Sequence, residues 1–144
     1  AVLRCALSQL VPQVVYCCQA TGGGGTEAYR RTYTEVVAAL QNVVPAARLV
    51  FCSSVSVYGS ANGVVREETL PVAPTARAQV LLETEQAVLS HGGVVLRLVP
   101  LYSERRCEVL RRHLAGEPCL PGCGKRMLNY LSHVCTVRLL QCKR

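Results

Sequence analysis

Apolar and polar residues follow two different patterns along the chain. Short runs that are apolar at nearly every position predict buried strands over residues 11–18, 49–57 and 93–101. Longer segments, in which apolar residues recur every three or four positions, predict helices over 26–44, 75–90 and 104–114, and the rest of the chain is expected to be loop up to an unassigned element over 134–141. Pro45 ends the first helix, and Thr75 is placed to cap the second.

This order of elements is typical of an α/β fold. Strands that are apolar on both faces belong to parallel sheets with helices on both faces, joined by right-handed crossovers. In such sheets ligands bind beyond the carboxyl ends of the strands. The segments in which we expect functional residues are therefore 18–25, 53–58 and 99–106.

The length of 144 residues predicts one domain over 1–144. No apolar run approaches the roughly 20 residues of a membrane span, and no signal-peptide pattern is visible. Nine cysteines, an odd number that includes the adjacent Cys17 and Cys18, are more typical of a reduced protein than of a disulfide scaffold. We therefore expect an intracellular, most simply cytoplasmic, protein.

Positive charge is confined to the end of the chain. Residues 1–96 hold six Arg and six Glu, whereas residues 97–144 carry the whole net charge of +7. One interpretation is a nucleic-acid patch, and the other is a solvated helix face with an ion pair between Glu108 and Arg112. The residues of that patch would be Arg105, Arg106, Arg111 and Arg112.

Two further motifs could bind a ligand, but each also has an explanation that needs none. Cys119-x3-Cys123 with His133-x-Cys135 resembles a zinc site, but it lacks the usual C-x2-C pairs, so we expect free thiols and no metal. The run QATGGGG follows a strand but lacks the G-x-G-x-x-G spacing, and no acidic residue ends the next strand. Its glycines either expose backbone N–H groups to an anion or form a flexible connection.

A family resemblance covers nearly the whole chain. Residues 49–59, LVFCSSVSVYG, resemble the S-S-x-x-V-Y-G strand and turn of the extended short-chain dehydrogenase/reductases, the NAD-dependent epimerase/dehydratase family. Further segments are similar to that family in the same order: VVYCCQA, EAYRRTYTEVVAALQNV, EETLPVAPTARAQVLLETEQAVL, VVLRLVPLYSERR and NYLSHV.

The resemblance implies a Rossmann-type parallel sheet with flanking helices, an NAD or NADP cofactor and a small-molecule substrate. It implies that Ser54 is the catalytic serine, and that Tyr58 either acts as an acid or has a structural role. The positions matching the cofactor-lining residues are Cys18, Gln19, Ala20, Ser53, Val99 and Pro100, and the substrate positions are Ser56 and Arg105.

Three departures from the family bear on function. No G-x-x-G-x-x-G unit lies before Val11, so we expect the first β-α-β unit, which holds the pyrophosphate, to be absent from this chain. Arg77 and Leu81 stand where the family has its catalytic Tyr and Lys. Arginine stays charged near neutral pH and leucine carries no proton, so neither replaces the pair.

These features predict a partial, catalytically impaired member of the NAD(P)-dependent epimerase/dehydratase oxidoreductases. The alternatives are a non-enzymatic module that binds a nucleotide or sugar nucleotide, and a basic nucleic-acid-binding fragment. A sheet without its first strands would expose a strand edge, which predicts self-association.

Overall fold

The computed structural model describes residues 11–59, 63–105, 107–117 and 129–141. The chain divides into two compact units, Ala1–Arg97 and Leu98–Arg144, which we describe separately. The division coincides closely with the change from the neutral to the basic part of the sequence.

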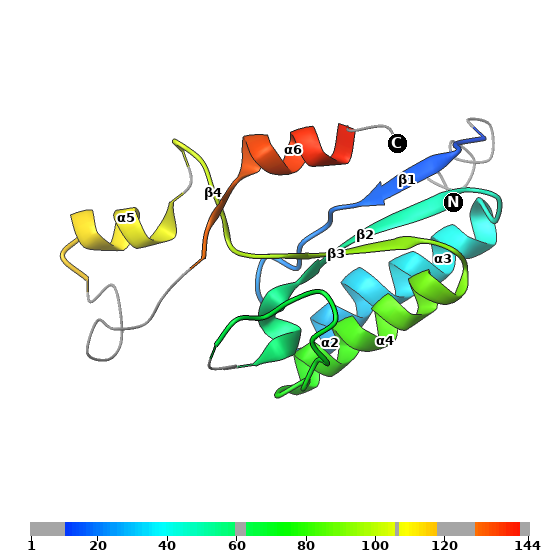
Figure 1. Cartoon of the computed structure of the whole chain (residues 1–144), viewed down its shortest axis with the longest axis horizontal. Helices are drawn as coiled ribbons and strands as arrows, with labels where there is room; N and C mark the ends of the chain where they lie inside the picture. Colours follow the sequence, from blue (N-terminus) through cyan, green and yellow to red (C-terminus); the bar gives the residue numbers. More distant parts are fainter. Residues whose placement is uncertain (1–10, 60–62, 106, 118–128, 142–144) are drawn as a thin grey trace. The chain divides into compact units, whose positions relative to one another are not determined.

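The first unit contains a three-stranded sheet with the order β1-β2-β3 (Figure 1). Its strands are β1 (Val14–Cys17), β2 (Arg48–Ser54) and β3 (Val94–Leu98), of which the last residue already belongs to the second unit. Strands β1 and β2 run parallel, with Val14 opposite Arg48 and Cys17 opposite Phe51. The predicted strands are thus present, although the first is shorter than residues 11–18.

The helices of this unit lie on one face of the sheet. α4 (Ala76–Ser90) contacts β2 and the helical segment between β1 and β2 (Figure 1). Along β2, Leu49, Phe51 and Ser53 are buried toward these helices, whereas the alternate residues are only partly buried. Within the described part of this unit, helices therefore flank one face, where the sequence predicts both.

The helix predicted over 26–44 forms with a wide turn in its middle. It runs as α2 (Thr26–Tyr29), the π-helical η1 (Arg30–Glu35) and α3 (Val36–Val43), and ends before Pro45. Tyr29 packs edge-on against Tyr33, and Tyr33 packs edge-on against the fully buried Phe51. The helix is held to the sheet by this aromatic row and by Val37 and Leu40.

The strand predicted over 49–57 ends earlier than expected. Residues Val55–Tyr58 form a short 3-10 helix, η2, and the side chain of Ser54 accepts a hydrogen bond from the Ser56 N–H at 3.1 Å. A hydroxyl that satisfies a free backbone donor ends the strand and begins the turn. Val57 and Tyr58 nonetheless stay buried, which explains their apolar pattern.

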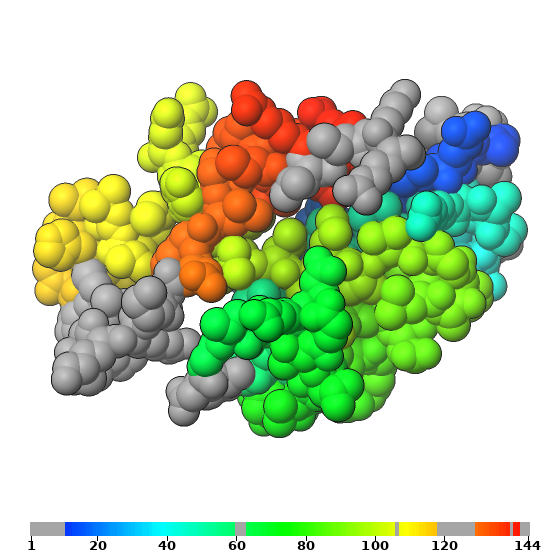
Figure 2. Space-filling view, in the orientation of Figure 1, coloured from blue at the N-terminus to red at the C-terminus, as the bar shows by residue number. Residues whose placement is uncertain are grey.

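Helix α4 begins where the sequence predicts. The hydroxyl of Thr75 accepts a hydrogen bond from the Ala78 N–H at 3.2 Å, so its capping role is confirmed. The preceding segment, residues 63–75, lies at the surface (green in Figure 2). Its apolar residues Val64, Leu70 and Val72 are all more than 70% exposed.

The second unit contains two short strands and two helices. Its elements are β4 (Leu101–Tyr102), α5 (Glu108–Leu114), β5 (Leu131–Ser132) and α6 (His133–Gln141). β4 and β5 pair in parallel, with Leu101 opposite Leu131. The strand predicted over 93–101 is divided, because β3 ends at Leu98 and Pro100 has no N–H to donate to a continuing ladder. The helix predicted over 104–114 begins only at Glu108.

None of the helices in the described ranges is both long enough and apolar enough to cross a membrane.

Candidate functional site

Two loops of the first unit begin at the same edge of its sheet. Because β1 and β2 are parallel, the segments that follow Cys17 and Ser54 lie together at the carboxyl ends of the strands. The sulfur atoms of Cys18 and Cys52, 3.3 Å apart, link these two ends directly. Parallel α/β sheets bind ligands at this edge, which makes it the candidate site.

The loop after β1 is anchored by a side chain and opened by glycines. The Gln19 amide donates to the Thr32 carbonyl at 3.1 Å, so this side chain holds the loop to the π-helical turn. Gly22, Gly23 and Gly24 all have positive φ, a conformation that glycine adopts without steric cost. A Cβ added at Gly22 or Gly23 would meet no atom within 4 Å, so this backbone is open to an approaching group.

The serines at the end of β2 have different surroundings. Ser54 is partly buried and Ser56 is exposed, so both remain accessible beside the turn. Ser53 is buried, and its hydroxyl donates to Glu85 Oε1 at 2.5 Å. A cofactor contact by Ser53 would therefore come from its backbone.

A buried carboxylate behind this edge accepts hydrogen bonds from two strands of the sheet. Glu85 in α4 is 2% exposed and accepts hydrogen bonds from Ser53 and from Arg97 in β3. The Arg97 Nη2 lies 2.7 Å and its Nε 3.0 Å from Glu85 Oε2. Hydrogen bonding to Glu85, together with Tyr58, raises the pKa of Arg97, so the guanidinium stays charged.

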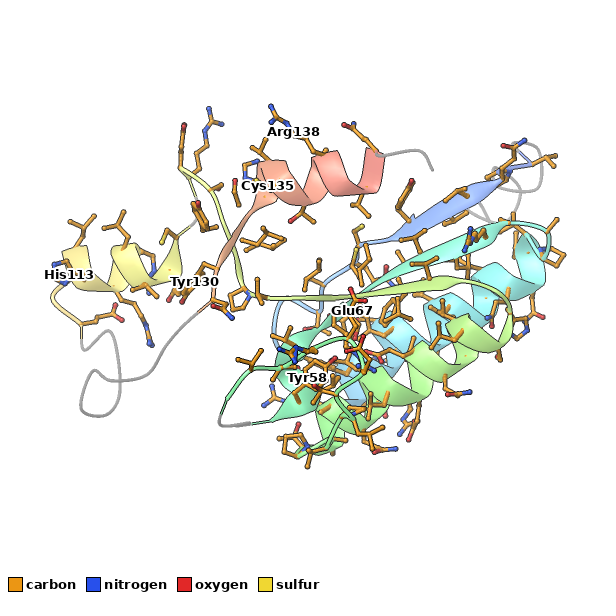
Figure 3. The ribbon with its side chains drawn as sticks, in the orientation of Figure 1. Tyr58, Glu67, His113, Tyr130, Cys135 and Arg138 are labelled. Carbon is orange, nitrogen blue, oxygen red and sulfur yellow. The ribbon has the colours of Figure 1, made fainter. Side chains whose placement is uncertain are left out.

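Arg97 also fixes Tyr58. Its Nη1 donates to the Tyr58 hydroxyl at 2.7 Å, and its Cζ lies 5.0 Å from the centre of the Tyr58 ring. The Tyr58 hydroxyl in turn lies 3.5 Å from the carbonyl of Arg66, at the limit of a hydrogen bond. Tyr58 is buried on the α4 side of the sheet (Figure 3). Of its two predicted roles, the geometry favours the structural one over that of an acid.

The two positions that align with the catalytic Tyr and Lys of the resembled family carry an arginine and a leucine. Leu81 is buried in the hydrophobic core, with 3% of its surface exposed. Arg77 is exposed in the first turn of α4, with its Cζ 5.7 Å from the centre of the Tyr29 ring. Neither side chain can take up and return a proton near neutral pH.

Two groups beside the edge have raised pKa values. Burial, with smaller contributions from Cys18 and Cys17, raises the pKa of the Cys52 thiol to about 12. Burial and the neighbouring Tyr29 raise the pKa of Tyr33, which the Thr21 backbone partly offsets. Both groups therefore remain protonated at neutral pH.

The remaining predicted residues lie in the second unit. Val99 and Pro100 follow β3, and Arg105 is exposed before α5. Arg111 and Arg112 are both ion-paired with Glu108 and Glu117, which weakens the case for a phosphate-binding patch. Arg106 lies outside the described residues.

The zinc motif is described only in part. Cys119 and Cys123 lie outside the described residues, whereas His133 and Cys135 begin α6 (Cys135 is labelled in Figure 3). Among the described residues, no three His, Cys, Asp or Glu side chains are grouped as a metal would need.

A hollow of about 150 Å³ lies at the opposite edge of the sheet. It is lined by Val11, Pro12 and residues 43–47, beside the amino ends of β1 and β2. Because ligands of parallel sheets bind at the carboxyl ends, we do not assign the site to this hollow.

Sequence reasoning missed the network around Glu85. The sequence contains a signal for it, since Glu85 falls among the apolar positions of α4 and Arg97 falls inside an apolar strand. Charged residues at such positions are almost never fully buried unless they are paired. Opposite charges on two buried faces therefore indicate an internal ion pair.

No protein-family model and no curated protein matches the sequence. Solved structures do. The UDP-glucuronic acid 4-epimerase from Bacillus cereus, in complex with UDP-glucuronic acid and NAD, matches 100% of this chain with a TM-score of 0.75 and 23% identity. MoeE5, in complex with UDP-glucuronic acid and NAD, matches 93% of this chain with a TM-score of 0.75 and 24% identity.

A third match is the dTDP-glucose 4,6-dehydratase from Bacillus anthracis in complex with NAD, with a TM-score of 0.74 and 17% identity over 96% of this chain. The chain spans about half the length of these proteins, 55%, 53% and 50% respectively. The chain therefore has the Rossmann-type α/β fold of about half of an NAD-dependent epimerase or dehydratase.

Proposed function

We propose that the chain is a partial member of the NAD(P)-dependent epimerase/dehydratase family. In this proposal it contacts the nicotinamide half of NAD or NADP at the carboxyl edge of β1 and β2. It is impaired in the family's oxidoreductase chemistry, because the proton-transferring pair is replaced. The sequence resemblance and the shared fold support membership.

One observation carries the binding part of the proposal. The backbone of Cys18–Ala20, the Ser53–Ser54 turn and the open glycines lie at one edge, as the register of β1 and β2 requires. Glycines that leave space for a close approach of backbone to a ligand fit a flat nicotinamide or a sugar. Ser54 and Ser56 would hydrogen-bond a substrate oxygen there. Val99, Pro100 and Arg105, in the second unit, remain predicted contributors.

The chemistry that is lost concerns proton transfer. Bound NAD or NADP would supply a hydride acceptor, but hydride transfer from an alcohol also needs a group that removes the hydroxyl proton. Leu81 is apolar and buried, and Arg77 is permanently charged. Ser54 would hold the substrate oxygen without a neighbouring base, which is orientation without proton removal.

Binding is tested by titrating the full chain with NADH and NADPH while following nicotinamide fluorescence. We expect saturation in the millimolar range, since residues 1–144 contain no G-x-x-G-x-x-G sequence to bind the pyrophosphate. Ser54→Ala should weaken binding severalfold, whereas Ser90→Ala, at the end of α4, should leave it unchanged. Absence of saturation at millimolar cofactor, or equal effects of both variants, would count against a site at this edge.

The same preparation tests the proposed impairment, in which the chain binds cofactor without turnover, as a non-enzymatic binding module also would. NAD and UDP-glucuronic acid are incubated with the chain, and both the absorbance of NADH and the sugar product are followed. We expect binding without turnover. Turnover that depends on Ser54 would overturn the proposed impairment and keep the family assignment.

A further inference from the structure

Cys18 and Cys52 occupy neighbouring positions on adjacent parallel strands. The register places Cys17 opposite Phe51, so the next residues along, Cys18 and Cys52, are side by side. Adjacent strands lie about 4.8 Å apart, within the Cα separation of roughly 4.4–6.8 Å that a disulfide requires. Their sulfur atoms are 3.3 Å apart, and both cysteines are free thiols.

The adjacent Cys17 is excluded from this pair by the pleat of the strand. Successive side chains on a strand point to opposite faces, and Cys17 is 2% exposed within the core that packs against the helices. Cys18 is exposed and Cys52 is partly buried on the other face. The arrangement therefore offers one accessible thiol with one partner behind it.

We propose that Cys18 and Cys52 form a reversible disulfide by exchange with a small-molecule disulfide of the glutathione class. This modification site overlaps the edge of the proposed cofactor contact at the Cys18 backbone, but the reaction requires no bound cofactor. It needs only an oxidised glutathione molecule and the two thiols.

The exchange takes place in two balanced steps. The Cys18 thiolate attacks one sulfur of the small disulfide, which forms a mixed disulfide and releases one small thiolate. Cys52 then gives its proton to solvent and attacks the Cys18 sulfur, which releases the second small thiolate. The two protein thiols are oxidised by two electrons, and one disulfide is reduced to two thiols.

The surroundings set the order of attack. Cys18 is the exposed thiol, so it meets the small disulfide first. Burial holds the Cys52 thiol in its protonated form at neutral pH, which makes the second step the slower one. That step should accelerate by up to about tenfold per pH unit between pH 7 and pH 9, because the Cys52 thiolate fraction rises in that proportion.

The test uses the reduced full chain, treated with oxidised glutathione and then with an alkylating reagent. Trypsin cleavage after Arg4, Arg30, Arg48 and Arg66 leaves Cys52 as the single cysteine of peptide 49–66 and Cys18 in peptide 5–30. We expect a cross-linked pair of these peptides, and at least tenfold slower alkylation of Cys52, both reversed by a reducing agent.

Variants assign the partners. The cross-link should survive Cys5→Ala and Cys17→Ala, which remove the other cysteines of peptide 5–30, and should disappear in Cys18→Ala. In Cys52→Ser we expect glutathione to remain attached to Cys18, which also shows that this variant folds with an accessible thiol. A cross-link that survives Cys18→Ala, or no cross-link together with full alkylation of both thiols, would overturn the proposal. These reactions are run without NAD or NADP, so either result leaves the cofactor titration as the separate test of the proposed function.

Discussion

The guanidinium of Arg97 donates hydrogen bonds to the buried carboxylate of Glu85, with Nη2 2.7 Å and Nε 3.0 Å from the same oxygen. The pair joins β3 to α4, and through Ser53 and Tyr58 it reaches the end of β2 and the turn after it. One ion pair thus holds together the elements that shape the carboxyl edge.

Removing the carboxylate should destabilise the fold strongly. Glu85→Gln leaves Arg97, whose side chain is 23% exposed, without its counter-charge, and breaking such a pair costs about 3 kcal/mol. Glu83→Gln is the matched control, because Glu83 pairs with Arg30 in an exposed ion pair worth less than about 1 kcal/mol. Urea unfolding of both variants measures the difference, and similar losses in the two would contradict the role assigned to Glu85.

The adjacent cysteines should respond differently to the same substitution. Cys17→Ser places a hydroxyl in the core, and a buried hydroxyl without a partner costs about 1–3 kcal/mol. Cys18→Ser changes an exposed side chain and should alter the free energy of unfolding by less than about 0.5 kcal/mol. The measurement is thermal unfolding under reducing conditions. Equal shifts in melting temperature would show that Cys17 is not in the core.

Stability should fall at alkaline pH because of Cys52. Its pKa is raised from 9.0 to about 12 in the folded chain, so folding favours the protonated thiol. The stabilisation is present below pH 9 and is lost as the pH rises from about 9 toward 12, where the unfolded chain releases the proton and the folded chain keeps it.

Unfolding midpoints at pH 8 and pH 10, measured with a reducing agent, check this expectation. Cys52→Ala should show a smaller decrease than the wild type, while Cys107→Ala serves as the control. A decrease of the same size in wild type and Cys52→Ala would locate the alkaline sensitivity elsewhere.

Gly93 should not tolerate a side chain. A Cβ there would meet the carbonyl oxygens of Leu49 and Val88 at 2.8 Å and a Val88 methyl at 2.5 Å. Gly93→Ala therefore forces the turn before β3 away from α4 and β2, at a cost of about 1–3 kcal/mol. Gly25→Ala has open space and an ordinary φ, so it should cost less than about 1 kcal/mol, through the loss of a glycine N-cap alone. Chemical denaturation of the two variants distinguishes these outcomes.

Self-association should depend on strand β1. Among the residues that the structure describes, β1 is an outer strand of its sheet, and Val14 is 42% exposed on it. Lysine on an edge strand opposes edge-to-edge pairing, so Val14→Lys should lower the apparent mass in light scattering. Glu35→Lys, which adds a lysine on an exposed helical position, is the control. A monodisperse wild-type monomer would contradict the prediction.

Much of the fold could be predicted because the apolar pattern and the residues that begin or end helices, such as Thr75 and Pro45, indicate the same element boundaries. The first helix, the Thr75 cap and the strand cores at 14–17 and 49–54 follow from local chemistry. The 3-10 turn at Val55–Tyr58 could not, since its apolar residues are buried as a strand's would be. Hydrophobicity records burial, and it does not distinguish a strand that continues from one that turns.

The candidate site was predicted by position more than by contact. The order of elements located the carboxyl edge. It could not show that Ser53 donates a hydrogen bond to Glu85 or that Arg97 donates one to the Tyr58 hydroxyl. These depend on the strand register and on charges far apart in sequence. The Cys18–Cys52 pair has the same origin, because only the alignment of β1 with β2 brings the two sulfur atoms together.

The wide turn over Arg30–Glu35 has a consequence for how this helix tolerates changes in length. A π-helical turn holds about one residue more than an α-helical turn, so it absorbs the residue that would otherwise rotate everything before it by about 100°. That spacing keeps Tyr29, Tyr33 and Val37 in line toward the sheet. Deleting one residue of this turn should therefore leave a regular α-helix in which Tyr29 keeps its place toward the sheet, so the helix can lose one residue without disturbing the face that it packs against the core.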